Sequence, residues 1–214
     1  ITNVTQEDLV ELPALQILNL ARNRIEFIED GAFAGNPALQ ALRLDSNLLQ
    51  DMSGIFASAP GVLYLNMSDN MITQFDYSYL PEKLNWLDLH RNLIADLGVA
   101  PRNMKLQTLD VSFNRLTRIH SRSIPDSIEL LFVNNNLISS VEPQTFFAKT
   151  NLTRVDLYAN LIVTMNLSAF QLTAVPSNRQ LPEFYIGGNP FICDCTTEWL
   201  QRINSFTLRQ HPRV

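Results

Sequence analysis

The chain has 214 residues, of which 46% are hydrophobic, so it is long enough and apolar enough to bury a substantial core. Its 21 Asp and Glu residues outnumber 16 Lys and Arg residues, and the net charge of −5 argues against a nucleic-acid partner, which usually requires a basic face. No run approaches the roughly 18 consecutive apolar residues of a membrane-spanning helix, so we expect none in this segment.

The N-terminal residues match the middle of a unit that occurs again downstream. Ile1, Val4 and Leu9 precede Leu15 by the same offsets that recur within residues 25–39. The chain has no initiator methionine or signal peptide, and it starts without the capping unit that shields the open end of a repeat array. We therefore expect a partial first repeat and a segment of a longer protein.

Eight asparagines recur in one apolar frame. They are Asn23, Asn47, Asn70, Asn92, Asn114, Asn136, Asn160 and Asn189. Each follows apolar residues at the third, fifth and eighth preceding positions, and the successive gaps are 24, 23, 22, 22, 22, 24 and 29 residues. A period of roughly 20–29 residues with this frame is the signature of a leucine-rich repeat solenoid. We predict about eight repeats over residues 1–192, the first of them partial.

The apolar frame of each repeat predicts a short strand. In the second repeat, Leu42 and Leu44 alternate with polar positions before Asn47, a period of two that is typical of a strand with one buried face. Stacked repeats place these strands in a parallel sheet on the concave face, and the returning halves form a convex face of irregular or short helical structure. The predicted fold class is an α/β leucine-rich repeat solenoid. The phenylalanines expected to pack on the convex side are Phe33, Phe56, Phe146 and Phe170.

The recurring asparagine has a structural explanation. Where the chain turns inward after each strand, backbone N–H and C=O groups lose their sheet partners and must be paired if they are buried. An amide side chain has donors and an acceptor together, so one buried asparagine can bridge the turns of adjacent repeats. We interpret the eight asparagines as a structural ladder and not as catalytic residues.

The outward positions of the predicted strands form the first candidate for a functional surface. Large side chains that we expect to be exposed there are Tyr64, Trp86, Leu130, Phe132, Tyr158 and Tyr185. Exposed apolar groups often mark interfaces. Asp88, Asp110 and Asp156 occupy one column of this face, with His90 beside them. The candidate ligand-binding residues on the concave face are therefore Tyr64, Trp86, Asp88, His90, Asp110, Phe132, Asp156 and Tyr158.

The aspartate column allows three interpretations. It fits a solvated acidic face, and it also fits a binding surface for a basic protein partner. An active site is the third, because Asp88 and Asp110 would lie about 5 Å apart on adjacent strands, close enough to raise one pKa. The open face shows no evident pocket, nucleophile or oxyanion donor, so catalysis is the least favoured. We predict that the chain is not an enzyme and uses no metal or cofactor.

Sequons for N-glycosylation occur at four positions, Asn3, Asn66, Asn151 and Asn166. Four is not far above the number that chance gives in a chain rich in Asn, Ser and Thr. Asn66 lies in a predicted strand and should point from the open face, where a glycan would block ligands locally.

The C-terminal part departs from the repeat pattern. The last gap is lengthened around residues 172–180, where Pro and polar residues predict a bulging loop. Residues 193–214 are predicted to be a truncated cysteine-rich cap. Its expected helix contains Trp199, Leu200 and Ile203, with an N-cap at Thr196 or Thr197.

Two cysteines open this predicted cap. Cys193 and Cys195 are too close in sequence for an unstrained mutual disulfide. A metal site would have only His211 as a further candidate ligand, so it is disfavoured. The favoured interpretation is two disulfides to cysteines beyond Val214, which implies an oxidising, extracellular setting.

Residues 181–204, with the sequence LPEFYIGGNPFICDCTTEWLQRIN, resemble the end of a leucine-rich repeat block in insect Toll receptors. The repeats from Leu15 to Asn160 are similar to the long Toll subgroup, so the resemblance covers nearly the whole chain. It implies that Cys193 and Cys195 are the first two cysteines of the family's cap. It also implies a cell-surface receptor, with its membrane and signalling segments elsewhere in the parent chain.

The resemblance implies a protein partner. A secreted, Spätzle-like cystine-knot protein is the partner expected for a Toll ectodomain. The alternative is a cell–cell adhesion module that pairs with another receptor ectodomain. Neither interpretation involves nucleic acid.

Overall fold

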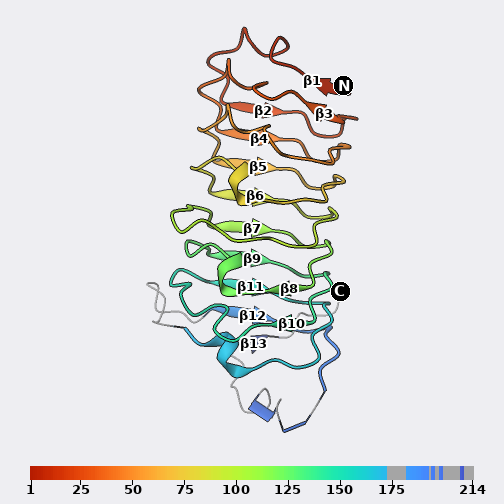
Figure 1. The fold of residues 1–214 in the computed structure, drawn as a ribbon, viewed down its shortest axis with the longest axis vertical. Helices are drawn as coiled ribbons and strands as arrows, with labels where there is room; N and C mark the ends of the chain where they lie inside the picture. The colour runs from red at the N-terminus through yellow and green to blue at the C-terminus, as the bar shows by residue number, and fades with distance from the viewer. Residues whose placement is uncertain (173–181, 193, 196–197, 200–207, 210–214) are drawn as a thin grey trace.

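The computed structural model describes residues 1–172, 182–192, 194–195, 198–199 and 208–209. The strands of successive repeats lie one above the next along the long axis of the molecule, as Figure 1 shows. In the described part they form one nine-stranded parallel sheet, in the order β13-β12-β11-β9-β7-β6-β5-β4-β2. The predicted leucine-rich repeat solenoid is confirmed.

The strands of the main sheet are two or three residues long. They are β2 (Ile17–Asn19), β4 (Ala41–Arg43), β5 (Tyr64–Asn66), β6 (Trp86–Asp88), β7 (Thr108–Asp110), β9 (Leu130–Phe132), β11 (Arg154–Asp156), β12 (Glu183–Tyr185) and β13 (Leu208–Arg209). Two small parallel sheets lie in the returning halves: β1 (Asn3–Val4) with β3 (Phe27–Ile28), and β8 (Arg118–Ile119) with β10 (Ser140–Val141). The returning halves also contain the 3₁₀ helices η1 (Tyr77–Tyr79), η2 (Ser121–Ser123) and η3 (Leu167–Phe170).

The strands share one register because each places an apolar residue at its middle position. Leu65 of β5 pairs with Leu42 of β4 on one side and with Leu87 of β6 on the other. From β5 to β11 these middle residues are completely buried, and they are Leu65, Leu87, Leu109, Leu131 and Val155. The residues on either side of them point outward. A period of two therefore gives the solenoid an apolar core and an open outer surface.

Asn92 shows how the asparagines join neighbouring repeats. Its Nδ2 donates to the carbonyl oxygens of Met67 and Leu89, both at 3.0 Å, and its Oδ1 accepts from the backbone N–H of Ile72 at 2.9 Å. The same three bonds recur at Asn47, Asn70, Asn114, Asn136, Asn160 and Asn189. In the first repeat, Asn23 donates within its own turn and accepts from the N-terminal amine of Ile1 at 3.3 Å.

The residue before each of these asparagines has a left-handed backbone conformation. The angle φ lies between 51° and 57° at Arg22, Ser46, Asp69, Arg91, Phe113, Asn135 and Ala159, and it is 70° at Gly188. This conformation is unfavourable for residues with a Cβ atom. It turns the chain inward, so that the next side chain reaches the backbone of two repeats.

Aromatic rings fill the core near the C-terminal end of the array. The ring of Phe146 lies 5.2 Å from that of Phe184 and 6.4 Å from that of Phe170. Trp199 extends this cluster, because its ring lies 5.5 Å from Phe170 and its Nε1 donates to the carbonyl oxygen of Met165 at 3.0 Å. The other predicted convex-side phenylalanines, Phe33 and Phe56, are also buried.

Several C-terminal predictions concern residues outside the described part of the chain. These are the loop beyond residue 172, Cys193, Thr196, Thr197, Leu200, Ile203 and His211. Cys195 is exposed, and the backbone at 198–199 is helical. The boundary between repeats and cap at residue 193 stays a prediction. Among the described residues, no helix combines the length and the apolar character that a membrane crossing requires.

Candidate binding face

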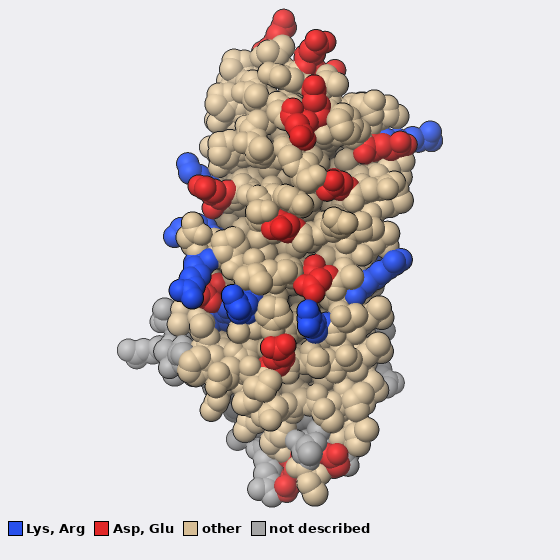
Figure 2. All heavy atoms as spheres, viewed as in Figure 1, with Lys and Arg blue, Asp and Glu red and all other residues tan. Residues whose placement is uncertain are grey.

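The candidate functional surface is the strand face. We define it as the outward side chains of the main-sheet strands β2, β4, β5, β6, β7, β9, β11 and β12 and of the turn that follows each of them. The strands present it as one continuous surface along the solenoid. Acidic side chains are spread along the long axis of the molecular face in Figure 2, and Lys and Arg side chains gather near its middle and margins. The described residues of that molecular face therefore form no continuous basic area of the kind that nucleic-acid binding requires.

The last residue of many strands accepts a hydrogen bond from the turn that follows. Asp88 Oδ1 accepts from the backbone N–H of His90, and Asp110 Oδ1 accepts from that of Ser112, both at 2.9 Å. The same bond is made by Asn19, Asn66 and Asp156. A short acceptor side chain here satisfies a backbone N–H that has left the sheet.

The predicted solvation of this aspartate column is wrong for two of its members. Asp88 is 8% exposed and Asp156 is 4% exposed, whereas Asp110 is half-buried. The physical reason is that these carboxylates lie along the turn and bond to it, and do not extend into water. The interpretation as a solvated acidic face therefore fails for Asp88 and Asp156.

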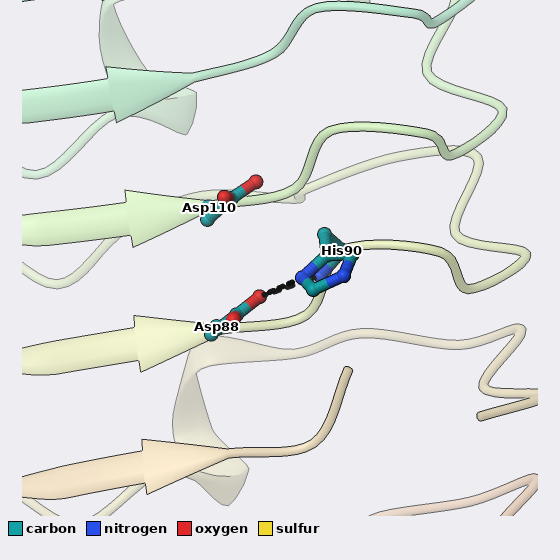
Figure 3. A group of neighbouring side chains, drawn as sticks. All are labelled: Asp88, His90 and Asp110. Carbon is teal, nitrogen blue, oxygen red and sulfur yellow. Dashed lines mark hydrogen bonds and ion pairs between the residues drawn. The ribbon is translucent and has the colours of Figure 1, made fainter. Parts of the chain in front are cut away.

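His90 bonds to another predicted candidate, Asp88 (Figure 3). Its Nδ1 lies 2.8 Å from Asp88 Oδ1, and its Nε2 lies 3.7 Å from an oxygen of Asp69. Burial raises the pKa of Asp110, hydrogen bonds from Ser112 oppose this shift, and the charge of Asp88 adds to it. The structure therefore brings Asp88, His90 and Asp110 together at the ends of β6 and β7.

This cluster offers three atoms that could bind a cation, all within 4.8 Å of one another. Zinc sites usually have about four ligands and calcium sites about six to eight. Asp88 already bonds to His90, and Asp110 already bonds to the Ser112 hydroxyl at 2.6 Å. We therefore interpret the cluster as a hydrogen-bonded part of the face, and not as a metal or catalytic centre.

The large side chains of the face are less exposed than their positions predict. Tyr64 is 53% exposed. The others, Trp86, Leu130, Phe132, Tyr158 and Tyr185, are half-buried, which corrects the expectation of exposed groups. Parallel strands lie only about 4.8 Å apart, so bulky residues in neighbouring positions shield one another.

Arg154 is a prominent residue of this face that the sequence patterns did not single out. Its guanidinium carbon lies 4.3 Å from the ring centroid of Tyr185 and 5.4 Å from that of Phe132. Its Nη2 bonds to Asp156 at 3.2 Å. A sequence signal existed, because Arg154 occupies an outward position diagonal to Phe132 and Tyr185, the outward aromatic residues that pair with Asp156 on the adjacent strands. We call Phe132, Arg154 and Tyr185 the aromatic–arginine stack.

A shallow apolar groove of about 330 Å³ lies at the N-terminal end of the strand face. Its lining residues are Ile17, Ala41, Leu42, Arg43, Tyr64, Asn66 and Trp86. Tyr64 and Trp86 are register partners on β5 and β6. The face is thus divided along its length into this groove, the Asp88–His90–Asp110 cluster and the aromatic–arginine stack.

Comparison with known proteins identifies relatives of this chain. Residues 1–49 and 104–162 match the family model of the leucine rich repeat. Over 173 residues the chain is 51% identical to Toll-like receptor 7 of Drosophila melanogaster, and the match covers 79% of this chain and 12% of that receptor.

Solved structures show the same fold. A chain of the Drosophila Toll–Spätzle complex superposes with a TM-score of 0.78 at 23% identity, covering 98% of this chain and 31% of that chain. A chain of the octameric complex of latrophilin 3, Unc5D and FLRT2 has a TM-score of 0.79 at 24% identity, covering 98% of this chain and 66% of that chain.

The stacked parallel strands and the open strand face define a repeat solenoid, a non-enzymatic fold for protein interactions. The chain belongs to the leucine-rich repeat family, and within it to the insect Toll receptor type. It spans about an eighth of the length of the Drosophila receptor that it matches.

Proposed function

We propose that this chain is an extracellular ligand-recognition segment of a Toll-type receptor at the cell surface. Its strand face would contact a secreted protein of the Spätzle-like cystine-knot class. The similarity to an insect Toll-like receptor supports the receptor role, and the solved Toll–Spätzle complex supports the ligand class. Glycans at Asn3, Asn66, Asn151 and Asn166, and disulfides from Cys193 and Cys195, belong to the same extracellular setting.

The observation that most supports this site is the aromatic–arginine stack. Aromatic and arginine side chains contribute a large share of the energy of protein interfaces. The guanidinium of Arg154 is already positioned by Asp156 and by two rings, so binding would cost it little conformational freedom.

The remaining candidates lie elsewhere on the same strand face. Asp110 and Tyr158 are half-buried on the strand face and would add polar and aromatic contacts. Asp88 and Asp156 act through their neighbours, because their carboxylates bond His90, Arg154 and the turns. A basic ligand would meet half-buried acidic groups such as Asp110 and Asp69.

Binding of the full glycosylated ectodomain to a panel of cystine-knot proteins tests the proposal. We expect Phe132→Ala to weaken binding about tenfold or more, which corresponds to about 1.4 kcal/mol, because it removes one ring of the stack. Leu137→Ala is the matched control, since Leu137 is 46% exposed and lies outside the strand face. Equal affinities of both variants and the wild type would place the site off the strand face.

Adhesion is the second candidate function. A structural neighbour of this chain occurs in a complex with latrophilin 3 and Unc5D. This suggests that the strand face could pair with another receptor ectodomain. The same binding experiment should include the ectodomain itself and its sister receptors. Binding restricted to those ectodomains would replace the cytokine-receptor proposal with adhesion.

A further inference from the structure

The apolar groove has a glycosylation sequon in its wall. The sequon consists of residues 66–68, and Asn66 is the last residue of β5. Tyr64 begins the same strand, Trp86 is its register partner, and all three residues line the groove. The other sequons lie elsewhere, in β1, in the turn at residue 151 and at the N-cap of η3.

The Asn66 side chain is oriented by its oxygen. Ser68 donates both its backbone N–H, at 2.9 Å, and its hydroxyl, at 2.7 Å, to Asn66 Oδ1. The amide Nδ2 has no hydrogen-bond partner within the described residues. The nitrogen to which a sugar attaches is therefore free at the edge of the apolar groove.

We propose that Asn66 carries an N-linked glycan whose first sugars pack in this groove against Tyr64 and Trp86. The N-terminal part of the strand face would then be covered by the chain's own carbohydrate. This inference rests on the proposed extracellular function, because the modification is made in the secretory pathway.

The modification transfers an oligosaccharide from a lipid-linked pyrophosphate donor. A bond forms between Asn66 Nδ2 and C1 of the first sugar, and the bond from C1 to the pyrophosphate oxygen breaks. Nδ2 loses one proton, and the lipid pyrophosphate is the leaving group. The Oδ1 atom is unchanged, so its two hydrogen bonds to Ser68 are retained.

The groove suits the apolar side of a sugar ring. A pyranose exposes a flat patch of C–H groups bordered by hydroxyls, and such a patch packs well against aromatic rings. Tyr64 is 53% exposed and Ile17 is 69% exposed, so the groove has apolar surface to cover. The two outward residues of β5 lie about 6.6 Å apart, which places the attachment point beside the Tyr64 ring.

The covalent attachment makes a weak contact sufficient. A tethered group has an effective concentration on the order of millimolar when its linker is short and matches the span. Sugar–aromatic contacts with dissociation constants on the order of millimolar would therefore be populated in the glycoprotein. A protein ligand would be directed to the part of the strand face that contains the aromatic–arginine stack.

Site-resolved mass spectrometry and hydroxyl-radical footprinting of the secreted full ectodomain test this inference. Ser68→Ala removes the sequon and keeps the Asn66 side chain and its bond from the backbone N–H of residue 68. We expect Asn66 to be glycosylated, and oxidation of Tyr64 and Trp86 to rise several-fold in this variant. Thr153→Ala is the matched control, because it removes the sequon at Asn151 and should leave both oxidation rates unchanged.

Asn66→Gln provides a second variant, because Ser68 is buried and its substitution could disturb folding. An unmodified Asn66 beside a modified Asn151 would overturn the groove inference alone. Equal oxidation rates in glycosylated wild type and both sequon variants would overturn it as well. Absence of carbohydrate at all four sequons would instead contradict the extracellular function on which the inference rests.

Discussion

Asparagine and aspartate perform two separate tasks in the repeats. The ladder asparagines, such as Asn92, lie in the core and bridge the backbones of two repeats. The strand-end residues, such as Asp88 and Asn66, lie on the strand face and accept from the turn of their own repeat. Both tasks use a short side chain with an oxygen acceptor, and the ladder also needs the amide N–H donors.

We expect Asn92→Ala to lower the free energy of unfolding by about 3 kcal/mol. It would leave the N–H of Ile72 without a partner in a buried region. The carbonyls of Met67 and Leu89 would each lose one of their two amide donors and keep the bond from Asn70 or Asn114. Asn134→Ala is the control, because Asn134 is half-buried and its side-chain amide donates only to the side chain of Asn135 among the described residues. Urea titration and hydrogen exchange at Ile72 measure the difference. A loss as small as that of the control would refute the ladder's energetic role.

Asp110→Asn tests the role of a strand-end residue through the pH dependence of stability. Burial in the folded state raises the pKa of Asp110 above its ordinary value of 3.8, so ionisation of this carboxyl opposes folding. Its contribution to the free energy of unfolding therefore falls as the pH rises from 3.8 through the raised pKa. Asparagine fits the position, as Asn66 does on β5. The variant should therefore be more stable than wild type at neutral pH, with no gain below pH 3.8. Denaturant titrations from pH 3 to 7 measure this, with the exposed Asp30→Asn as control.

At the scale of elements, short strands and 3₁₀ helices need partners from adjacent repeats. Lys149 illustrates this, because it is 2% exposed although it is charged. Its Nζ donates to the carbonyl oxygens of Ser121 and Ile124 and to the carboxylate of Asp126. A lysine from one repeat thus satisfies the backbone around η2 in the repeat before it. All three of its donors have partners, which makes its burial tolerable.

We expect Lys149→Met to cost about 2–4 kcal/mol, because one buried and one partly buried carbonyl lose their donor while the apolar volume stays similar. Hydrogen exchange should rise at residues 121–126. Lys105→Met, at an exposed position, should stay within about 0.5 kcal/mol of wild type. Unchanged exchange around η2 in the Lys149 variant would show that this lysine does not hold the element.

At the scale of the whole molecule, the solenoid is one array in which each repeat packs on its neighbours. Within the described residues, each main-sheet strand between β2 and β13 pairs in parallel with the main-sheet strand before it and with the one after it. The central leucines form a continuous row in the core. Stability should therefore depend on the interfaces between successive repeats. The destabilisation caused by a defect should spread only to nearby repeats.

Leu109→Ala should destabilise the chain by about 2–5 kcal/mol, since it opens a cavity under β7. We expect hydrogen-exchange protection to fall in β6 and β9 as well, and to be retained in β2. Leu161→Ala is the control, because Leu161 is 49% exposed. Uniform loss of protection along the whole sheet would argue against this local coupling.

The fold could be predicted from the sequence because it depends on periodic local patterns. The alternation at Leu42 and Leu44 specifies a strand, and the spacing of the asparagines specifies how strands stack. The candidate site was harder to predict. The positions of Phe132 and Asp110 on the strand face followed from the pattern, but the burial of Asp88 and Asp156 did not, because it depends on the turn to which they bond.

The sequence by itself determined the solenoid, the direction of its side chains and its membership of the leucine-rich repeat family. Each of these follows from residue spacing, which the pleated strand converts directly into inward and outward positions. Only the tertiary structure decided that Arg154 lies between Phe132 and Tyr185 and that Asn66 borders an apolar groove. Such contacts join residues of different repeats, and their geometry depends on how closely the strands approach and how each side chain packs across them.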